Sequence, residues 1–317
     1  MDIETNTYAG PVRIEASNLI ALLYFVFCNT LTLFGLYLST QASTVLWISG
    51  QITLALAFMQ WFIILHEAGH GTFFKSKHLN TLTGHYASVF AFIPFLTWRS
   101  VHNSHHKWTG WQDIDLTTAS LVPRELSRAE RFLFNNCWRF CIPIFSVIYR
   151  ITNFWNLVRV RQFLSKQYKR SFVVNSIFLA LIYIFIFSYF NFPVLFETLG
   201  LALFISLFLQ ENIIVSQHTH IPMRHSGNQS QRPFSCKQQV VFTRSLRFPR
   251  WISQILLLNF NAHELHHCYL HVPGYFLQRI NFTSKNEFNG FRWIVKARTT
   301  PGEIFFLQNR DFSGLFL

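Results

Sequence analysis

The sequence predicts an all-α integral membrane protein, with four transmembrane helices in two hairpins and a helical cap that faces the cytoplasm. Half of the 317 residues are hydrophobic and 37 are phenylalanine, which is unusually apolar for a soluble protein of this length. Four apolar segments are long enough to cross a bilayer. They cover residues 19–38, 44–65, 172–190 and 194–215. Because no low-complexity run or interdomain linker divides the chain, we expect one domain over residues 1–317.

Short turns join the apolar segments into pairs. Residues 39–43 connect the first pair and residues 191–193 the second, and neither turn contains Lys or Arg. All 27 basic residues lie in the N-terminal arm, in the middle segment 66–171 or after residue 216. Since basic segments stay on the cytoplasmic side, this distribution predicts a cytoplasmic cap. The even number of spans then places both termini on the same side.

Three further apolar stretches are interrupted by polar residues or proline. They lie around residues 84–97, 132–150 and 249–260. We interpret them as interfacial or buried helices rather than as spans.

The charge and the cysteines argue against a nucleic-acid-binding protein and against a disulfide-rich protein. The net charge of +13 suits either nucleic acid or an anionic membrane surface, and the apolar segments favour the membrane. We therefore expect no nucleic-acid partner. The five cysteines include no CxxC pair and indicate no disulfide framework. The polar, acidic N-terminus predicts no cleavable signal peptide.

Eight histidines form three tight clusters, which are the most informative feature of the chain. The clusters are His66-Glu67-Ala68-Gly69-His70, His102-Asn103-Ser104-His105-His106 and His263-Glu264-Leu265-His266-His267. Neutral imidazole is a good ligand for iron or zinc, and one ion rarely takes more than about four to six ligands. Spacings of three and four residues place ligands on one face of a helix. Eight imidazoles therefore predict two metal ions, and the topology brings all three clusters to the cytoplasmic face.

Two other functions compete with this interpretation. The segments His66–His70 and His263–His267 both match the HExxH motif of zinc proteases. A protease site would leave the second cluster and one HExxH motif without a role. A metal transporter would need ionisable residues across the spans, and only Glu197 and Glu211 lie within them.

The order HxxxH, HxxHH, HxxHH, interleaved with two hairpins, resembles the membrane fatty acid desaturase and hydroxylase superfamily. Wider strings resemble acyl-lipid desaturases of the Δ12/ω3 type, and the likeness runs from about residue 60 to 275. These strings are residues 66–74, Trp98-Arg99, Thr109-Gly110 with Asp113, and Gln217-His218-Thr219-His220. The chain departs from the pattern at Ala68, where many members carry Cys, and at Glu264-Leu265.

The resemblance implies a non-haem diiron centre held almost wholly by histidine, with a further ligand just after the fourth span. We expect His218 to be that ligand, and His220 could bind instead of it or in addition to it. Glu211 and Asn212 could support the ligands or could form a polar patch within the helix bundle. Asp113 and Asp115 could each orient an imidazole or could equally cap a loop. The expected iron ligands are His66, His70, His102, His105, His106, His218, His263, His266 and His267.

The function implied is an O2-dependent fatty acyl desaturase. Its substrate would be an acyl-lipid or an acyl thioester, and two iron ions would be its cofactor. No haem, flavin or iron–sulfur motif is evident, so the resemblance implies a separate electron donor: ferredoxin, rubredoxin or cytochrome b5. The alternatives are a lipid or carotenoid hydroxylase or ketolase of the same superfamily and, more distantly, the HExxH protease.

Overall fold

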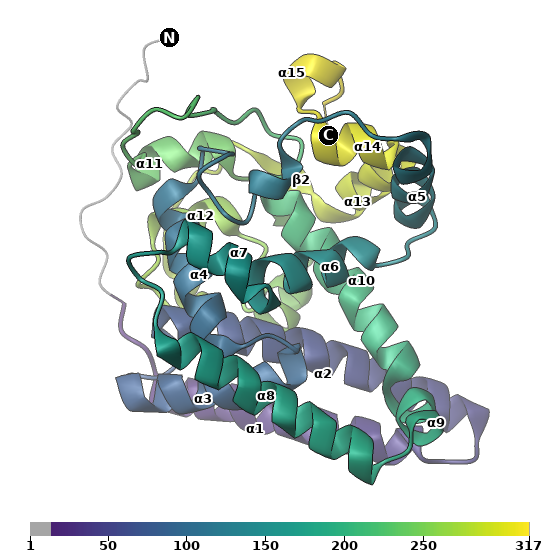
Figure 1. Cartoon of the computed structure of the whole chain (residues 1–317). Helices are drawn as coiled ribbons and strands as arrows, with labels where there is room; N and C mark the ends of the chain where they lie inside the picture. Colours follow the sequence, from purple (N-terminus) through teal and green to yellow (C-terminus); the bar gives the residue numbers. More distant parts are fainter. Residues whose placement is uncertain (1–13, 317) are drawn as a thin grey trace.

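The computed structural model describes residues 14–316, and this part of the chain is mostly helical. Four helical segments within it are long and apolar enough to cross a membrane, as predicted. Figure 1 shows α1, α2 and α8 in the lower part of the molecule and α10 rising from there into a cap. The four segments are α1 (Asn18–Ser39), α2 (Thr44–His70), α8 (Arg170–Tyr189) and the run made by α9 (Phe192–Leu195), η3 (Phe196–Gly200) and α10 (Leu201–His218).

The cap consists of shorter elements from the middle and the end of the chain. Its two strands form a short parallel ladder in which Leu246 pairs with Phe288. Helix α3 (Lys77–Ala91) is not part of the cap but lies in the lower part of the molecule and packs against α2. The cap elements are α4 (Phe95–Trp108), η1 (Ala119–Leu121), α5 (Arg128–Arg139), α6 (Ile144–Arg150), η2 (Ile151–Trp155), α7 (Leu157–Phe163), α11 (Cys236–Gln239), η4 (Val240–Phe242), β1 (Ser245–Arg247), η5 (Ile252–Leu256), α12 (His263–Cys268), η6 (Gly274–Arg279), β2 (Glu287–Asn289), α13 (Gly290–Thr299), α14 (Gly302–Leu307) and α15 (Arg310–Ser313).

The second and fourth apolar segments are longer than the sequence predicts. The expected end at residue 65 is wrong, because α2 continues to His70 and stops only where Gly71 takes a left-handed backbone (φ 74°). The run Phe192–His218 likewise continues to His218. Each has 27 residues, or roughly 40 Å at 1.5 Å per residue, against a hydrocarbon core of roughly 30 Å. Both helices can therefore carry histidines beyond the apolar core.

The turn before the fourth segment is shorter than expected. Phe192 and Pro193 already belong to α9, and Asn191 caps that helix by accepting a hydrogen bond from the Val194 N–H at 3.1 Å. Proline fits this first turn because the missing N–H would have no partner there. The connection is thus confined to the residues around Phe190 and Asn191.

The interrupted stretch 132–150 is divided between two helical segments. Helix α5 and the run α6–η2 meet at 110°, so that together they form a bent pair. Proline at position 143 stands at the break, immediately before α6. Trp138 of α5 stacks on Phe305 of α14, with ring centroids 4.6 Å apart, and this contact fixes the pair against the C-terminal helices.

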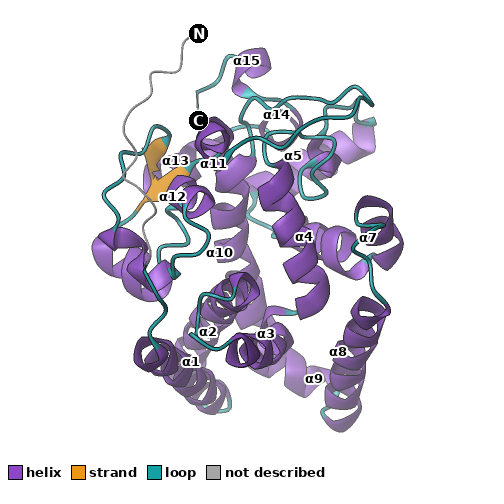
Figure 2. Ribbon diagram, turned by 90° about the vertical axis from the view of Figure 1, so that its left-hand side faces the viewer, coloured by secondary structure: helices purple, strands orange, loops and turns teal. Residues whose placement is uncertain are grey.

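Burial separates the apolar helices into two kinds. Helix α2 packs against α1, α3 and α10, and most of its second half is buried. By contrast, α1 and α8 expose apolar side chains such as Leu23 (61% exposed) and Phe185 (69% exposed). Such surfaces are costly in water and suit a lipid environment. Figure 2 shows α4 and α10 standing between these lower helices and the rest of the cap.

Candidate metal centre

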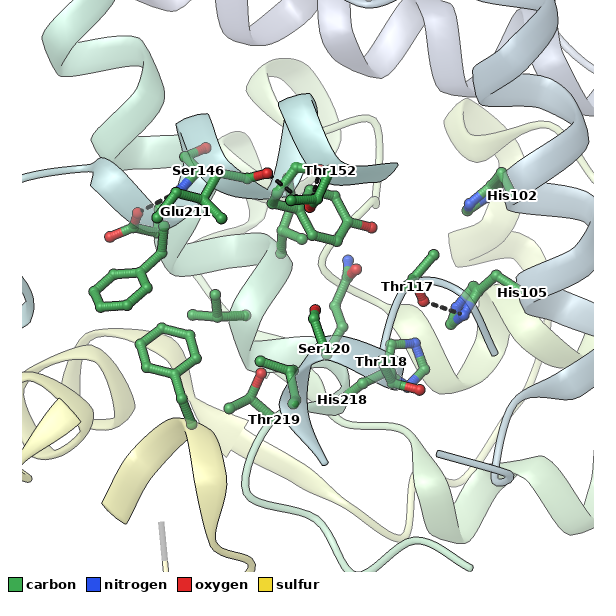
Figure 3. A pocket seen from close by; sticks show the side chains of 18 of the residues that line it. His102, His105, Thr117, Thr118, Ser120, Ser146, Thr152, Glu211, His218 and Thr219 are labelled. Atoms are coloured by element: carbon green, nitrogen blue, oxygen red, sulfur yellow. Dashed lines mark hydrogen bonds between the residues drawn. The ribbon is translucent and has the colours of Figure 1, made fainter. Parts of the chain in front are cut away.

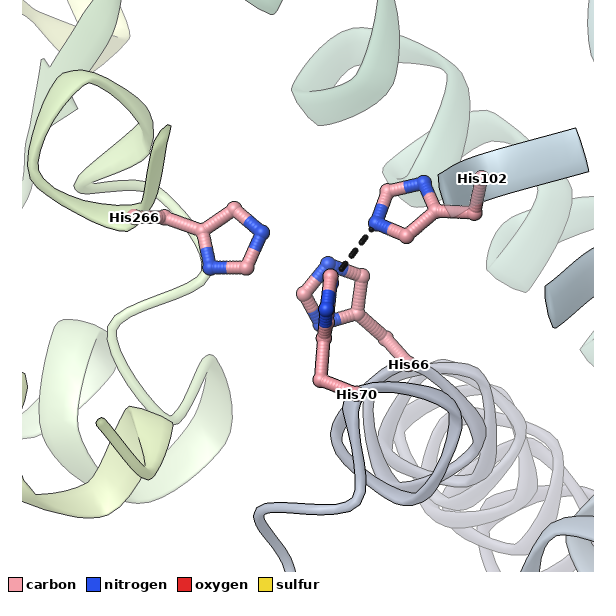
Figure 4. Close-up of side chains that lie close together, drawn as sticks. All are labelled: His66, His70, His102 and His266. Atoms are coloured by element: carbon pink, nitrogen blue, oxygen red, sulfur yellow. Dashed lines mark hydrogen bonds between the residues drawn. The ribbon is translucent and has the colours of Figure 1, made fainter. Parts of the chain in front are cut away.

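Eight of the nine predicted ligands form two groups of four imidazoles. Within each group, the candidate ligand nitrogens all lie within 4.8 Å of one another. The first group is drawn in Figure 4, where rings from α2, α4 and α12 converge on one point. The groups are His66, His70, His102 and His266, and His105, His218, His263 and His267.

Helical spacing explains how three short motifs supply two groups. His66 and His70 lie four residues apart on α2, and the two rings face each other with centroids 4.8 Å apart. On α12, the Nε2 atoms of His263 and His267 lie 3.0 Å apart. Helices α4 and α12 each contribute to both groups, whereas α2 serves only the first and α10 only the second.

His106, the remaining predicted ligand, lies between the groups. Its Nε2 is 3.0 Å from that of His102 and 3.2 Å from that of His266. Its ring centroid is 4.3 Å from that of His267, and its buried Nδ1 has no hydrogen-bond partner in the described part of the chain. His106 can therefore serve the first group while contacting the second.

The donor set fits metal ions better than it fits internal hydrogen bonding. Nε2 atoms of neighbouring rings face each other at 2.9 Å between His70 and His102, and at 2.8 Å between His218 and His263. The buried Nε2 of His66 has no hydrogen-bond partner among residues 14–316. Several nitrogens that converge on one point, some of them unpaired, can be satisfied by a cation. Imidazole ligands suit iron as well as zinc, copper and nickel.

Hydrogen bonds at the other ring nitrogen orient four of these rings. His105 Nδ1 lies 2.6 Å from the Asp115 carboxylate, and His66 Nδ1 lies 3.2 Å from the Glu67 carboxylate. His218 Nδ1–H donates to the Phe242 carbonyl at 2.9 Å. His267 Nδ1 is 2.9 Å from Gln239 Oε1. When Nδ1 carries the proton, Nε2 presents its lone pair to the metal.

Electrostatics favour the ligand forms of these groups. Burial first, and neighbouring imidazoles second, lower the pKa of the cap histidines well below the usual value, so they are neutral at pH 7. Burial raises the pKa of Asp115, but His105 and hydrogen bonds from Thr117 outweigh it and lower the pKa below its ordinary value. Asp115 is therefore an ionised acceptor. The cap histidines concerned are His102, His106, His263, His266 and His267.

Trp98 packs against the first group, and the missing side chain of Gly69 leaves room for its ring. Its indole stacks on the His102 ring, with centroids 4.5 Å apart and planes 20° apart. A Cβ at Gly69 would lie 2.2 Å from Cζ3 of Trp98. Glycine at position 69 therefore lets α4 approach α2 closely enough for both helices to contribute ligands.

Four of the predicted site residues lie outside the two groups: His220, Asp113, Glu211 and Asn212. His220 has a left-handed backbone (φ 60°), and its Nε2 faces Ser313 Oγ at 3.0 Å and the Leu315 carbonyl at 3.2 Å, away from both groups. Asp113 accepts hydrogen bonds from Ser226 rather than from an imidazole.

Glu211 and Asn212 bind the guanidinium of Arg298 rather than a metal-ligating histidine. Glu211 pairs with Arg298 at 3.0 Å, and the Asn212 carbonyl oxygen accepts from Nε of the same arginine at 2.9 Å. Sequence reasoning missed Glu67 and Gln239 as partners of the ligands. Glu67 could have been suspected from its place in the motif, but no local signal marks Gln239, which lies 28 residues from His267.

A cavity with a volume of about 170 Å³ opens beside both groups. One part of its wall contains His66, His102, His105, His218 and His263. Figure 3 shows His102 and His105 on one side and Glu211 with Ser146 on the other. Much of the remaining wall is apolar and includes Phe62, Phe134, Phe145, Phe260 and Phe306. A cavity with an apolar wall and few convergent polar groups suits a long apolar ligand.

An apolar helical fold that brings three histidine motifs together beside such a cavity defines the histidine-box class of membrane proteins. The sequence pattern of the family described as fatty acid desaturase matches residues 42–293. The chain belongs to the fatty acid desaturase family.

Individual relatives agree with this assignment. The chain is 25% identical over 252 residues to an sn-1 oleoyl-lipid 12-desaturase of Synechocystis sp., covering 73% of this chain and 66% of the relative. It is 24% identical over 253 residues to the enzyme of that name from Picosynechococcus sp., covering 74% and 68%. A shorter match of 58 residues, 41% identical, joins it to an sn-1 acyl-lipid omega-3 desaturase (ferredoxin) of Synechocystis sp., covering 18% and 16%. The matched part thus spans about two thirds of the first two relatives.

Proposed function

We propose that this protein is an O2-dependent desaturase that introduces a double bond into an acyl chain of a membrane lipid. The observation that carries the proposal is the cavity, because ligands of both histidine groups form part of its largely apolar wall. Membership of the desaturase family supports it, and the sn-1 oleoyl-lipid specificity in the names of the relatives supports a lipid substrate.

We propose that the two groups hold two iron ions. His66, His70, His102 and His266 would hold the first, with His106 beside them, and His105, His218, His263 and His267 the second. Bound iron, supplied with O2 and electrons, can remove hydrogen from two neighbouring methylenes, with water as the other product.

The chain's own residues would bind and position the substrate. Phe134, Phe145 and Phe306 pack closely together in the cavity wall, and the rings of Phe145 and Phe306 lie 4.3 Å apart. These side chains can hold an acyl chain by apolar contact and exclude water from it. Phe62 and Phe260 form the wall next to His66 and would direct one stretch of the chain past the histidines.

The structure gives the protease alternative little support. Glu67, which would be its general base, accepts hydrogen bonds from the Thr72 hydroxyl at 3.0 Å and the Gly274 N–H at 2.7 Å. Glu264, in the other HExxH motif, accepts from the backbone N–H groups of Lys285 and Asn286 at 2.9 Å each. Both carboxylates are thus committed to structural hydrogen bonds, whereas a general base must reach a metal-bound water.

We also propose the membrane arrangement. The two pairs of apolar helices would cross the bilayer as hairpins, with the cap, the histidines and both termini on the cytoplasmic side. The absence of Lys and Arg between residues 19 and 65 and between 172 and 215 supports this orientation. We further infer a single domain over residues 1–317 and a separate one-electron donor protein.

Expression in a host with defined membrane lipids tests the function. Gas chromatography of fatty acid methyl esters should reveal a new unsaturated product, and His263→Ala should abolish it. His78→Ala is the matched control, since this histidine is exposed on α3, and it should leave the product unchanged. Hydroxylated fatty acids without a new double bond would instead establish the hydroxylase alternative.

A further inference from the structure

The segment that follows His220 forms a basic surface on the cap. Residues 222–239 contain Arg224, Arg232 and Lys237 but no Asp or Glu. Arg224 and Arg232 are exposed, as is Lys107 at the end of α4. The carboxylate of Asp113 contacts this segment by accepting hydrogen bonds from Ser226. In Figure 1, α11 and this segment lie at the opposite end of the molecule from α1 and α8.

The basic segment is fastened to the end of α4 rather than loosely attached. The Arg224 N–H donates to the Gly110 carbonyl, and the Gln112 N–H donates to the Arg224 carbonyl, each at 2.9 Å. Trp111 Nε1–H donates to the Arg232 carbonyl at 3.0 Å. The arginines are therefore held in a fixed relation to Trp111.

An aromatic ring lies directly beneath Arg224. The Arg224 guanidinium lies 5.5 Å from the centroid of the Phe234 ring, which is partly exposed. Phe234 stacks on Trp111 with centroids 5.2 Å apart, and it lies 5.1 Å from Phe242. Glycine at position 110 makes room for this packing, since a Cβ there would lie 2.6 Å from the Phe242 ring and 2.8 Å from the Phe234 ring.

Two short connections lead inward from the rings, and both end at the second histidine group. The Phe242 carbonyl accepts a hydrogen bond from His218 Nδ1–H at 2.9 Å. The Trp111 carbonyl accepts from the Asp115 N–H at 3.0 Å, and Asp115 contacts His105 at 2.6 Å. From Phe234 at the surface, one further ring and one hydrogen bond reach a candidate metal ligand.

We propose that this basic surface, which comprises exposed Arg224 over Phe234, exposed Arg232 and exposed Lys107 at the end of α4, is the docking site of an acidic one-electron carrier protein. One electron would leave the reduced carrier, which is oxidised, and enter at the second histidine group, where ferric iron is reduced to ferrous. No bond is formed or broken. Electron tunnelling weakens steeply with distance, so a short packed route favours entry here. The inference rests on the proposed function, because only a redox enzyme needs such a partner.

Charge complementarity argues for a protein carrier rather than a lipid surface. An acidic partner is steered to a basic surface, and weak electron-transfer complexes need only a small interface. The surface lies away from the exposed apolar side chains of α1 and α8, where a bilayer would be. Anionic lipid is therefore the less favoured occupant, and the test includes it.

Binding of an acidic [2Fe–2S] ferredoxin to the full chain in nanodiscs of neutral lipid tests the docking site. Arg224→Glu with Arg232→Glu should weaken binding on the order of tenfold and reduce its dependence on salt. Arg161→Glu with Lys166→Glu makes the same charge change at exposed positions in and after α7 and should leave binding unchanged. Equal binding by both double variants would overturn the proposal. So would a loss of affinity for anionic vesicles in place of ferredoxin.

The route has its own test, which separates this inference from the proposed function. Phe234→Leu should leave ferredoxin affinity unchanged but slow the oxidation of bound ferredoxin several-fold in stopped-flow absorbance. Phe234→Trp should restore the rate, and Phe291→Leu, an exposed phenylalanine of α13, serves as control. An unchanged rate in Phe234→Leu would overturn the route. If the chain binds ferredoxin as expected but forms no double bond even with a chemical reductant, the proposed function fails and the docking site stands.

Discussion

Asp115 contacts His105 Nδ1 at 2.6 Å and is almost fully buried. Thr117 holds the same carboxylate through its N–H and its hydroxyl, each at 2.9 Å from Oδ1. One oxygen is thus fixed by the loop while the other orients the imidazole. This arrangement makes Asp115 part of the support for the second histidine group rather than a simple loop cap.

Replacing this carboxylate should weaken metal binding without removing a ligand. Asp115→Asn keeps the shape but loses the charge, and we expect iron affinity to fall roughly 10–100-fold. Competition with a chelator, followed by analysis of the iron that remains bound, measures this affinity. Asp113→Asn is the matched control, since its carboxylate contacts Ser226. An equal loss in the control would contradict the role given to Asp115.

The two groups should lose iron separately. Anaerobically loaded protein should contain about two irons per chain. His70→Ala affects only the first group and His267→Ala only the second, so each variant should retain about one iron. Elemental analysis with Mössbauer spectroscopy distinguishes the outcomes. A single tightly bound zinc that supports peptide hydrolysis would refute the diiron proposal.

His218 and His220 should behave differently although they lie two residues apart. His218→Ala removes a member of the second group and should abolish desaturation, whereas His220→Ala should retain bound iron. His220 contacts the C-terminal residues Ser313 and Leu315, so its loss should affect only their packing. Iron content of both variants decides the matter, and a reversed pattern would disprove the assignment.

The buried pair of Glu211 and Arg298 should matter for stability. Their side chains are 0% and 8% exposed, so Arg298→Met leaves a buried carboxylate without its partner. We expect a loss of about 3–5 kcal/mol, with partial recovery in the double variant Arg298→Met, Glu211→Gln. Thermal unfolding in detergent reports it. The ion pair of Arg131, whose side chain is 58% exposed, with Glu303, whose side chain is 27% exposed, gives the control, and Arg131→Met should cost no more than about 1 kcal/mol.

Cysteine labelling should establish the orientation in the membrane. In a chain whose native cysteines are serine, Gln41→Cys and Asn191→Cys should react with an impermeant reagent from outside. Lys285→Cys should react only after the membrane is opened, because basic segments stay inside. Labelling of position 285 from the outside in intact cells would rule out a cytoplasmic cap.

The sequence predicted what depends on local periodicity. The three motifs lie on helices α2, α4 and α12, and most of their histidines converge as their spacing suggested. The ends of the long helices were not predicted, because hydropathy falls at Glu67 while the helical backbone continues to His70. Hydropathy reports the apolar part of a helix rather than its hydrogen bonding.

Contacts between distant segments could not be inferred from one sequence. Glu211 pairs with Arg298, which lies 87 residues later, and neither residue has a local motif that indicates the other. Gln239 and Phe242 reach the histidines from short elements without a repeating pattern. Tertiary packing alone determines such partners.

The division of ligands among the helices has a mechanical consequence. Helices α2 and α10 each end in one histidine group, and α4 and α12 connect the two groups in the cap. When the thickness of a bilayer changes, long membrane helices accommodate it by tilting. Here such a tilt would pull on both groups, and the cross-bracing by α4 and α12 would resist any change in the spacing between them. The cap would thus keep the distance between the two groups constant when the thickness of the membrane changes, although the enzyme itself would alter the lipids of that membrane.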